Sequence, residues 1–270
     1  METKDINSTV IFLDVRNFTP SMKEFSTDPE FFELINNVYK CGLFAISSFC
    51  KEEEYYLNST GDGFLAVIMG DNHYIKAYLI GLLLVNHTKH WFENFYYDKK
   101  ESKLYPCEGK YFYGIGMESG YVKKIKTPVI ANKQIETYLG NVINLAARIE
   151  ALSKDHGRAP MLFGPTINNL LSESVFGVPY NELIHEAKNM RGQECVNVEY
   201  EEMTKINLKL LSSYIFEHNL KGVDNPIPIF RLSPTQFQNM KLHEWEFLKN
   251  IPLEISETFI ELYKKFPIPK

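Results

Sequence analysis

The chain has 270 residues, of which 44% are hydrophobic and 23% are charged, and its formal net charge is -5. This composition is typical of a globular protein and excludes a disordered or fibrous chain. The acidic balance argues against general nucleic-acid binding, which needs a basic surface, but allows one polyanionic small molecule in a locally basic cleft. The length suits one large domain, or one domain with an appendage.

The cysteines and the hydropathy pattern predict the cellular compartment of the protein. The four cysteines form no C-x-x-C pair, and no histidine cluster has the spacing of a zinc site. They are Cys41, Cys50, Cys107 and Cys195. The amino terminus lacks the pattern of a signal peptide, and the longest apolar run, 77–85, is far shorter than a membrane span. We therefore expect reduced thiols in a cytoplasmic protein without membrane or nucleic-acid partners.

The first third of the chain predicts a strand, a helix, a hairpin and a second helix. Residues 9–15 (TVIFLDV) are β-branched and apolar, as in a buried strand. Asp28 is a suitable N-cap and Pro29 a suitable first residue for the helix that follows. Within 54–69, two strand-like runs flank Thr-Gly-Asp-Gly, which predicts a hairpin. A helix is then expected over about 72–95.

The middle of the chain continues with alternating strands and helices. Residues 110–126 predict two strands around a Glu-Ser-Gly turn. The segment 137–148 (TYLGNVINLAAR) is apolar enough for a buried helix. A short strand is expected in 159–164 and a short helix in 165–174, whereas 176–207 is polar and gives no clear prediction.

The last part of the chain predicts a closing hairpin over 211–232, with Lys221 and Gly222 near its turn. Beyond it, 237–251 and 256–266 are helix-like. Strands and helices mix without a strict βαβ repeat, which favours an α+β sandwich.

Two aspartates could hold a divalent cation. Asp14 ends the first strand, where it either caps the next loop or binds a metal ion. Asp62 lies between two glycines, where it either belongs to a plain turn or converges on Asp14. Paired aspartates beside a phosphate suit Mg²⁺ or Mn²⁺, and two such ions can clamp a phosphoryl centre and activate a hydroxyl.

Other polar residues could contact phosphate or ribose. Asn144 and Arg148 lie four apart, so both side chains emerge from one face of their helix. They either belong to an ordinary helix surface or contact a substrate. In the second case, an arginine placed where negative charge builds on phosphorus would lower the reaction barrier. Lys221 is either a solvated hairpin lysine or a phosphate contact. The loop VRNFT, which includes Phe18 and Thr19, could bind phosphate oxygens through backbone N–H groups.

In this order, these segments resemble the class III nucleotidyl cyclases, the adenylyl and guanylyl cyclase homology domain. The resemblance covers residues 8–232, leaving out 176–207 and the tail 233–270. Its motifs are VIFLDVRNFT, STGDGFLAV, YGIGMESGYV, LGNVINLAARIEALS and LKGVDNPIPIFRL. It implies a ferredoxin-like βαββαβ domain of the α+β class, followed by a C-terminal hairpin and a helical tail.

The resemblance also implies a reaction and a set of roles. Asp14, Asp62 and the carbonyl of Val15 would hold two Mn²⁺ or Mg²⁺ ions per site. Asn144 would position the ribose, and Arg148 would stabilise the pentavalent phosphate. Lys221, Phe18 and Thr19 would contact the phosphates of a nucleoside triphosphate. The 3′-hydroxyl would attack the α-phosphate and release pyrophosphate, at sites shared between the two chains of a homodimer.

The expected base-reading positions depart from the family. They lie four residues before Asp62 and seven before Asn144, which gives Asn58 and Thr137. Adenylyl cyclases usually have lysine and aspartate there, and guanylyl cyclases glutamate and a small residue. Asn58 and Thr137 are short and neutral and match neither purine pattern.

Unfused class III domains with unusual base-reading residues resemble the pyrimidine cyclases of bacterial Pycsar antiphage systems. That likeness implies cyclic UMP or cyclic CMP as the product, with UTP favoured over CTP, and a separate effector protein that binds the cyclic nucleotide. Three alternatives stay open. One is an adenylyl cyclase with unorthodox base contacts, and another is a silent homologue that only binds nucleotide. The third is a polymerase-like palm domain, which shares the two aspartates but would lack the Asn/Arg helix and give linear products.

Overall fold

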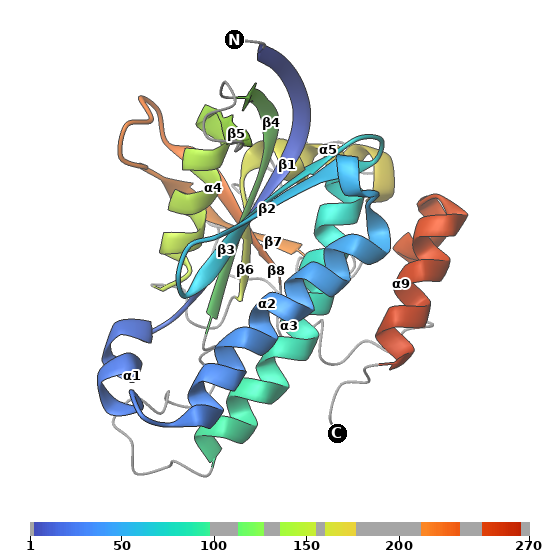
Figure 1. Ribbon diagram of the computed structural model, residues 1–270. Helices are drawn as coiled ribbons and strands as arrows, with labels where there is room; N and C mark the ends of the chain where they lie inside the picture. The colour runs from blue at the N-terminus through green and yellow to red at the C-terminus, as the bar shows by residue number, and fades with distance from the viewer. Residues whose placement is uncertain are drawn as a thin grey trace, which may run out of the picture.

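The structure is a computed structural model that describes residues 3–97, 113–126, 136–154, 160–176, 212–232 and 245–265. Its centre is a mixed eight-stranded sheet in the order β2-β3-β1-β4-β6-β8-β7, with β5 paired to β4 (Figure 1). The strands are β1 Thr3–Val15, β2 Tyr55–Ser59, β3 Gly63–Met69, β4 Tyr113–Lys126, β5 Glu136–Leu139, β6 Met161–Phe163, β7 Ser212–His218 and β8 Ile227–Leu232. Only the β4–β6 pair is parallel among the described strands.

Helices cover both faces of the sheet. They are α1 Phe18–Glu24, α2 Pro29–Phe49, α3 His73–Tyr97, α4 Asn141–Leu152, α5 Pro165–Leu171 and α9 Leu253–Lys265. Single turns are η1 Glu52–Glu54, η2 Ser172–Phe176 and η4 Glu246–Asn250. The order β1-α2-β2-β3-α3-β4-α4-β6 contains the expected βαββαβ unit, and β7 with β8 forms the expected closing hairpin (Figure 1). The predicted α+β fold class is therefore confirmed.

Strand β1 divides the core into two layers because successive side chains point to opposite faces. Ile11 and Leu13 join the large apolar cluster under α2 and α3. Val10 joins the smaller cluster with Val142 and Ala146 of α4. By the same alternation Asp14, four residues after Val10, points to the α4 face. The strand is longer than the predicted 9–15, because its polar first half pairs with the second half of β4.

Helix α2 begins as its sequence predicts. Asp28 accepts a hydrogen bond from the backbone N–H of Glu30 at 2.9 Å, and Pro29 occupies the first turn. Its buried residues pack against α3, which follows the β2–β3 hairpin. This places the two longest described helices side by side on one face of the sheet (Figure 1).

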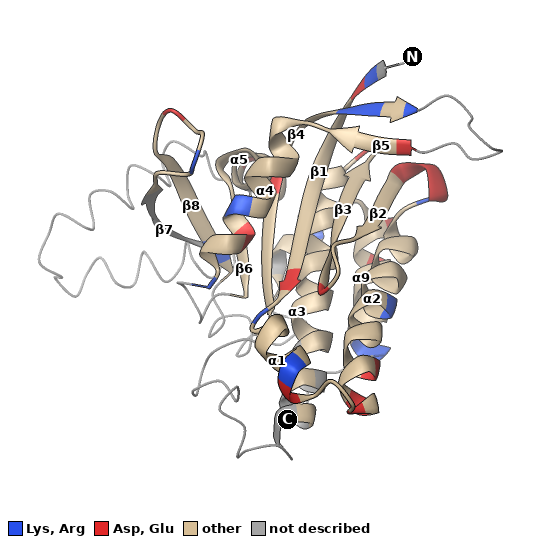
Figure 2. Cartoon of the chain, turned by 60° about the vertical axis from the view of Figure 1, so that its left-hand side comes forward, with Lys and Arg blue, Asp and Glu red and all other residues tan. Residues whose placement is uncertain are grey.

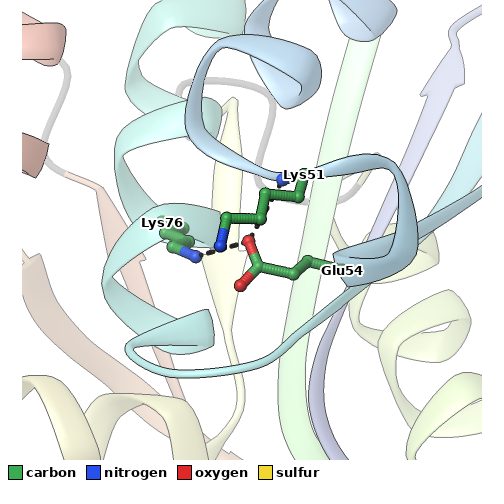
Figure 3. Close-up of polar contacts among 3 residues, drawn as sticks. All are labelled: Lys51, Glu54 and Lys76. Carbon is green, nitrogen blue, oxygen red and sulfur yellow. Dashed lines mark hydrogen bonds and ion pairs between the residues drawn. The ribbon is translucent and has the colours of Figure 1, made fainter.

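A partly buried ion pair ties the start of β2 to α3. Glu54 accepts hydrogen bonds from Nζ of Lys76 at 3.0 Å and from the backbone N–H of Lys51 at 3.1 Å (Figure 3). Lys76 is buried, and these contacts together hold the pKa of Glu54 below its usual value although burial opposes them. The pair fixes the far end of the β2–β3 hairpin, away from Asp62.

The predicted turn at Glu118, Ser119 and Gly120 is wrong: β4 runs through it without interruption. Gly120 pairs with Ser8 of β1. The glycines of this segment serve close packing instead. A Cβ atom added to Gly116 would lie 2.2 Å from the backbone nitrogen of Glu150, so only glycine lets α4 approach the strand this closely.

The described part of the tail packs on the helical layer. Helix α9 contacts α2 and α3 on the side away from the sheet (Figure 1). Trp245 is buried and stacks on Phe247 and Phe259, whose rings belong to the main apolar cluster. The predicted helix over 237–251 is described only from Trp245, where it is a short 3-10 turn. The predicted boundary at 232/233 adjoins undescribed residues and stays a prediction, and 177–207 also lies outside the described chain.

Candidate active site

Asp14 and Asp62 meet at one edge of the sheet. Asp14 pairs with Gly63 of β3 and with Gly114 of β4, so glycines flank it on both sides. Asp62 directly precedes Gly63, and its carboxyl group is close enough to Asp14 to raise the pKa of that residue. Figure 2 shows acidic residues at the end of β1 and at the β2–β3 turn. The structure thus brings together the two carboxylates that the sequence proposed as a pair.

Burial and the second carboxylate both disfavour ionisation of Asp14. Burial, followed by the charge of Asp62 and its hydrogen bond, raises the pKa of Asp14 to about 6. The ammonium of Lys154 acts in the opposite direction, with Nζ 3.6 Å from Oδ2 of Asp14. Two carboxyl groups held this close favour either a shared proton or a cation between them.

The turn that carries Asp62 is held by backbone geometry and by one tyrosine. Gly61 has φ of +105°, a conformation that favours glycine. The N–H of Thr60 donates to the carbonyl of Gly63 at 2.9 Å. The hydroxyl of Tyr39 in α2 lies 3.0 Å from the carbonyl oxygen of Gly61 and 2.7 Å from that of Gly63. Tyr39 was not among the residues that the sequence singled out, because a helix tyrosine carries no signal of this contact.

The chain turns sharply after β1. Val15 is buried at the end of the strand, and Asn17 has a left-handed conformation with φ of 57°. Phe18 stacks on Phe31 at a ring distance of 6.0 Å, so its side chain anchors the loop in the core. Thr19 is exposed in the first turn of α1, where helix N–H groups have no intrahelical acceptor. Phosphate contacts from Phe18 and Thr19 would therefore come from their backbone.

The carboxyl end of α4 closes over Asp14, which sequence reasoning missed. Glu150 is only 4% exposed, and burial followed by the charge of Asp14 raises its pKa to about 7. Nη2 of Arg16 donates to the carbonyl of Ser153 at 2.6 Å. The available signal was the pair Glu150 and Lys154, two charges four residues apart near the end of an apolar helix.

Asn144 and Arg148 lie on the other side of the same helix. An α-helix turns by about 100° per residue, so these two side chains are about 40° apart around the axis. Val142, Ala146 and Ile149 are buried against the sheet, whereas Asn144 is exposed. Within one chain, the Asn/Arg pair therefore points away from the face that approaches Asp14.

The closing hairpin lies on the Asn/Arg side of α4. A methyl group added to Gly222 would lie 3.4 Å from Nη2 of Arg148, so the guanidinium packs against the hairpin turn. Gly222 itself needs glycine because its φ is +71°. Lys221 precedes it and is exposed. The structure thus brings Arg148 to the turn that carries Lys221.

The two expected base-reading residues lie on strands that are not adjacent, because β3, β1 and β4 separate β2 from β5 in the sheet. Asn58 is exposed on β2, on the same face as Tyr56. Thr137 is half-buried on β5, next to Tyr138. The rings of Tyr56 and Tyr138 are 4.8 Å apart, so the contact between these elements is made by the tyrosines and not by Asn58 and Thr137.

The donor set at Asp14 fits a hard divalent ion that is completed by its substrate. It offers two carboxylates, and oxygen donors are what Mg²⁺ and Mn²⁺ prefer. The carbonyl of Val15, the third donor that the cyclase resemblance implies, follows Asp14 directly in the chain. No group of three or more His, Cys, Asp or Glu residues that could hold a metal occurs in the described chain. Such ions typically take one or two carboxylates and fill the remaining positions with water and phosphate oxygens.

The fold matches solved cyclase domains. The adenylyl cyclase CyaB from P. aeruginosa superimposes with a TM-score of 0.55 and 16% identity, covering 86% of this chain and 96% of that one. A bacterial light-regulated adenylyl cyclase gives 0.53 and 15% over 96% of this chain. The guanylyl cyclase Cya2 gives 0.52 and 17%, covering 86% of this chain and 94% of that one. No protein-family model and no curated protein matches the sequence.

At these identities the likeness establishes the fold alone: the chain has the α+β fold of class III nucleotidyl cyclase domains. It spans only 59% of the light-regulated adenylyl cyclase. A separate property concerns the membrane: among the described helices, none is long and apolar enough to cross one.

Proposed function

We propose that the protein is a pyrimidine nucleotide cyclase, which converts UTP or CTP to the 3′,5′-cyclic nucleotide and pyrophosphate. The observation that carries this proposal is the division of polar residues between two faces of a cyclase fold. Asp14 and Asp62 form one half-site, and Asn144, Arg148 and the Lys221 turn form the other. A single chain holds the halves apart, so a complete site needs a second copy of the chain in a homodimer.

The metal half-site would bind the triphosphate and generate the nucleophile. Asp14, Asp62 and the carbonyl of Val15 would hold two Mn²⁺ or Mg²⁺ ions. Bound there, the ions supply Lewis-acid stabilisation of the phosphates and lower the pKa of the ribose 3′-hydroxyl. The backbone N–H groups of Phe18 and Thr19 would orient the phosphate oxygens.

The partner chain would supply the groups that act on the reacting centre. Asn144 would donate and accept hydrogen bonds at the ribose and so hold the 3′-hydroxyl in line with the α-phosphorus. Arg148 would neutralise the charge that builds on the pentavalent phosphate, and its packing against Gly222 holds it in place before reaction. Lys221 would contact the departing pyrophosphate.

The choice of base rests on Asn58 and Thr137. Neither side chain is charged, and each has both donor and acceptor capacity. An adenine or guanine site of the usual pattern needs longer or charged partners at these positions, and mismatched polar groups reject a base strongly. The asparagine amide can face either the uracil carbonyl or the cytosine amine, and we favour UTP.

The product would act as a second messenger. We propose that cyclic UMP or cyclic CMP activates a separate effector protein in bacterial antiphage defence, with the cyclase in the cytoplasm. The support is the resemblance of the base-reading residues to the pyrimidine cyclases of Pycsar systems.

Product identification tests the proposal. The purified protein is incubated with Mn²⁺ and with ATP, GTP, CTP or UTP separately, and the products are identified by mass spectrometry. The expected result is cyclic UMP or cyclic CMP with an equal amount of pyrophosphate, and no product from the Asp62→Asn variant. Formation of cyclic AMP would overturn the pyrimidine assignment but support the cyclase activity. Nucleotide binding without any product would overturn the enzymatic role.

A further inference from the structure

We propose that Lys154 is a built-in counter-ion of the metal site, whose ammonium neutralises the Asp14–Asp62 pair until a divalent ion displaces it. This inference rests on the proposed function, because it concerns the same metal site. It assigns a regulatory role to a residue outside the motifs that define the cyclase resemblance.

Two contacts between the end of β1 and the end of α4 position Lys154. Nζ of Lys154 lies 3.6 Å from Oδ2 of Asp14. Lys154 follows Ser153, whose carbonyl accepts the 2.6 Å hydrogen bond from Nη2 of Arg16. Arg16 is itself two residues from Asp14. The end of β1 and the end of α4 therefore hold each other at a spacing that brings the lysine tip to the carboxylates.

The charges at this point explain why a cation is needed there. Asp14 interacts electrostatically with two acidic groups, Asp62 on one side and the buried Glu150 on the other. Arg16 is half-buried beside Glu150, and moving to the carboxylate pair would break its hydrogen bond to the carbonyl of Ser153. Among the described residues, Lys154 is the cation that forms an ion pair with Asp14. Its long side chain can move away when another cation neutralises the carboxylates.

An ammonium and a divalent ion cannot share this position. Metal-bound carboxylate oxygens lie about 2.0–2.1 Å from Mg²⁺, so an ion on Asp14 would come within a few ångströms of Nζ. Like charges this close repel each other, although water around the exposed lysine screens part of the repulsion. The side chain of Lys154 is 54% exposed, so it can swing into water when the ion enters. Displacing the Lys154 ammonium from Asp14 therefore lowers the affinity of the site for the metal ion.

The test measures Mn²⁺ binding without nucleotide, by electron paramagnetic resonance of the free ion, in the wild type, Lys154→Met and Lys154→Arg. Methionine keeps the aliphatic length and removes the charge. We expect Lys154→Met to bind Mn²⁺ about three- to tenfold more tightly than the wild type, because it removes one partly solvated positive charge. The difference should become smaller at high salt, which screens the charge in the wild type. Lys154→Arg should bind as the wild type does, because the charge is retained.

A matched control is Lys123→Met. The side chain of Lys123 is 63% exposed and its Nζ lies 3.9 Å from Oδ1 of Asp5, a pair like that of Lys154 but at the other end of β1. It should leave Mn²⁺ affinity unchanged. Equal or weaker binding by Lys154→Met would overturn the counter-ion role, and so would equal tightening by Lys123→Met.

One further variant separates this inference from the proposed function. Asp62→Asn should lose Mn²⁺ binding. If the wild type and Asp62→Asn bind Mn²⁺ alike, the metal site itself is wrong, and both proposals fall. If Asp62→Asn loses binding while Lys154→Met matches the wild type, only the role of Lys154 falls.

Discussion

Arg148 and Glu150 lie two positions apart on α4 but contact opposite sides of the domain. The guanidinium of Arg148 packs against the turn at Gly222, and the carboxyl of Glu150 lies under the helix beside Gly114. A rotation of about 200° separates them around the helix axis. One helix thus borders the Asp14–Asp62 pair of its own chain with one face and presents the Asn/Arg pair with the other.

Arg148→Ala should lower kcat more than it raises KM. The guanidinium is proposed to meet charge that develops only in the transition state, and the loss of such a contact typically costs about 10²- to 10³-fold in kcat. Steady-state kinetics with UTP or CTP and Mn²⁺ would check this. A rise in KM with kcat unchanged would mean that Arg148 only binds the ground state.

Metal binding should weaken as the pH falls through about 6. The pKa of Asp14 is raised to about 6 by burial and by Asp62, so below that pH a proton occupies the carboxylate that the ion needs. The apparent Mn²⁺ affinity should therefore fall by up to about tenfold per pH unit below this point and level off above it. Calorimetric titrations across this range provide the measurement. An affinity independent of pH would contradict either the raised pKa of Asp14 or its role as a metal ligand.

Glu118 should make the protein less stable as the pH rises from about 4.5 to about 7. Burial raises its pKa from 4.5 to about 7 and outweighs the backbone N–H groups of Ser119, Thr166 and Ile167, which lower it. In this range the folded state binds more protons than the unfolded state, so unfolding becomes easier with increasing pH, by at most about 3 kcal/mol. Glu118→Gln should remove this part of the pH dependence, measured by urea unfolding at several pH values. An unchanged slope would show that Glu118 titrates normally.

Gly116→Ala should destabilise the domain far more than Gly120→Ala. An added Cβ at Gly116 would lie 2.2 Å from the backbone nitrogen of Glu150, whereas at Gly120 the nearest atom is Cβ of Val142 at 3.4 Å. Overpacking against backbone costs about 1–3 kcal/mol or more, while the Val142 side chain can adjust. Chemical denaturation of both variants gives the comparison. Equal stabilities would mean that α4 does not need its close approach to β4.

The sequence predicted most of the elements because their local signals agree with the final contacts. Asp28 and Pro29 begin α2 as expected, and the turn Thr-Gly-Asp-Gly joins β2 to β3. Asp14 and Asp62 were expected to converge if β1 lay beside this hairpin, and the pairing of Asp14 with Gly63 provides that neighbour. The Lys221–Gly222 turn likewise lies in the predicted hairpin, between β7 and β8.

The errors came from residues whose purpose depends on distant parts of the chain. Gly120 suggested a turn, but in β4 the glycines admit α4, a contact that no local pattern reports. Glu118 looked like a turn residue, yet it is buried and accepts a hydrogen bond from the N–H of Ile167 at 3.0 Å. Glu150 and Lys154 drew no attention because their relation to Asp14 arises only when the end of α4 packs over β1.

The central claim is that one active site is assembled from two chains, and mixed dimers test it most directly. Asp62→Asn damages the metal half-site and Arg148→Ala damages the other half, so each homodimer should be inactive. In a heterodimer of the two variants, one site has both defects and the other is intact. Mixing tagged chains, purifying the heterodimer and measuring cyclic-nucleotide formation should therefore restore about half of the wild-type activity. A purified heterodimer as inactive as its parents would contradict a site shared between chains.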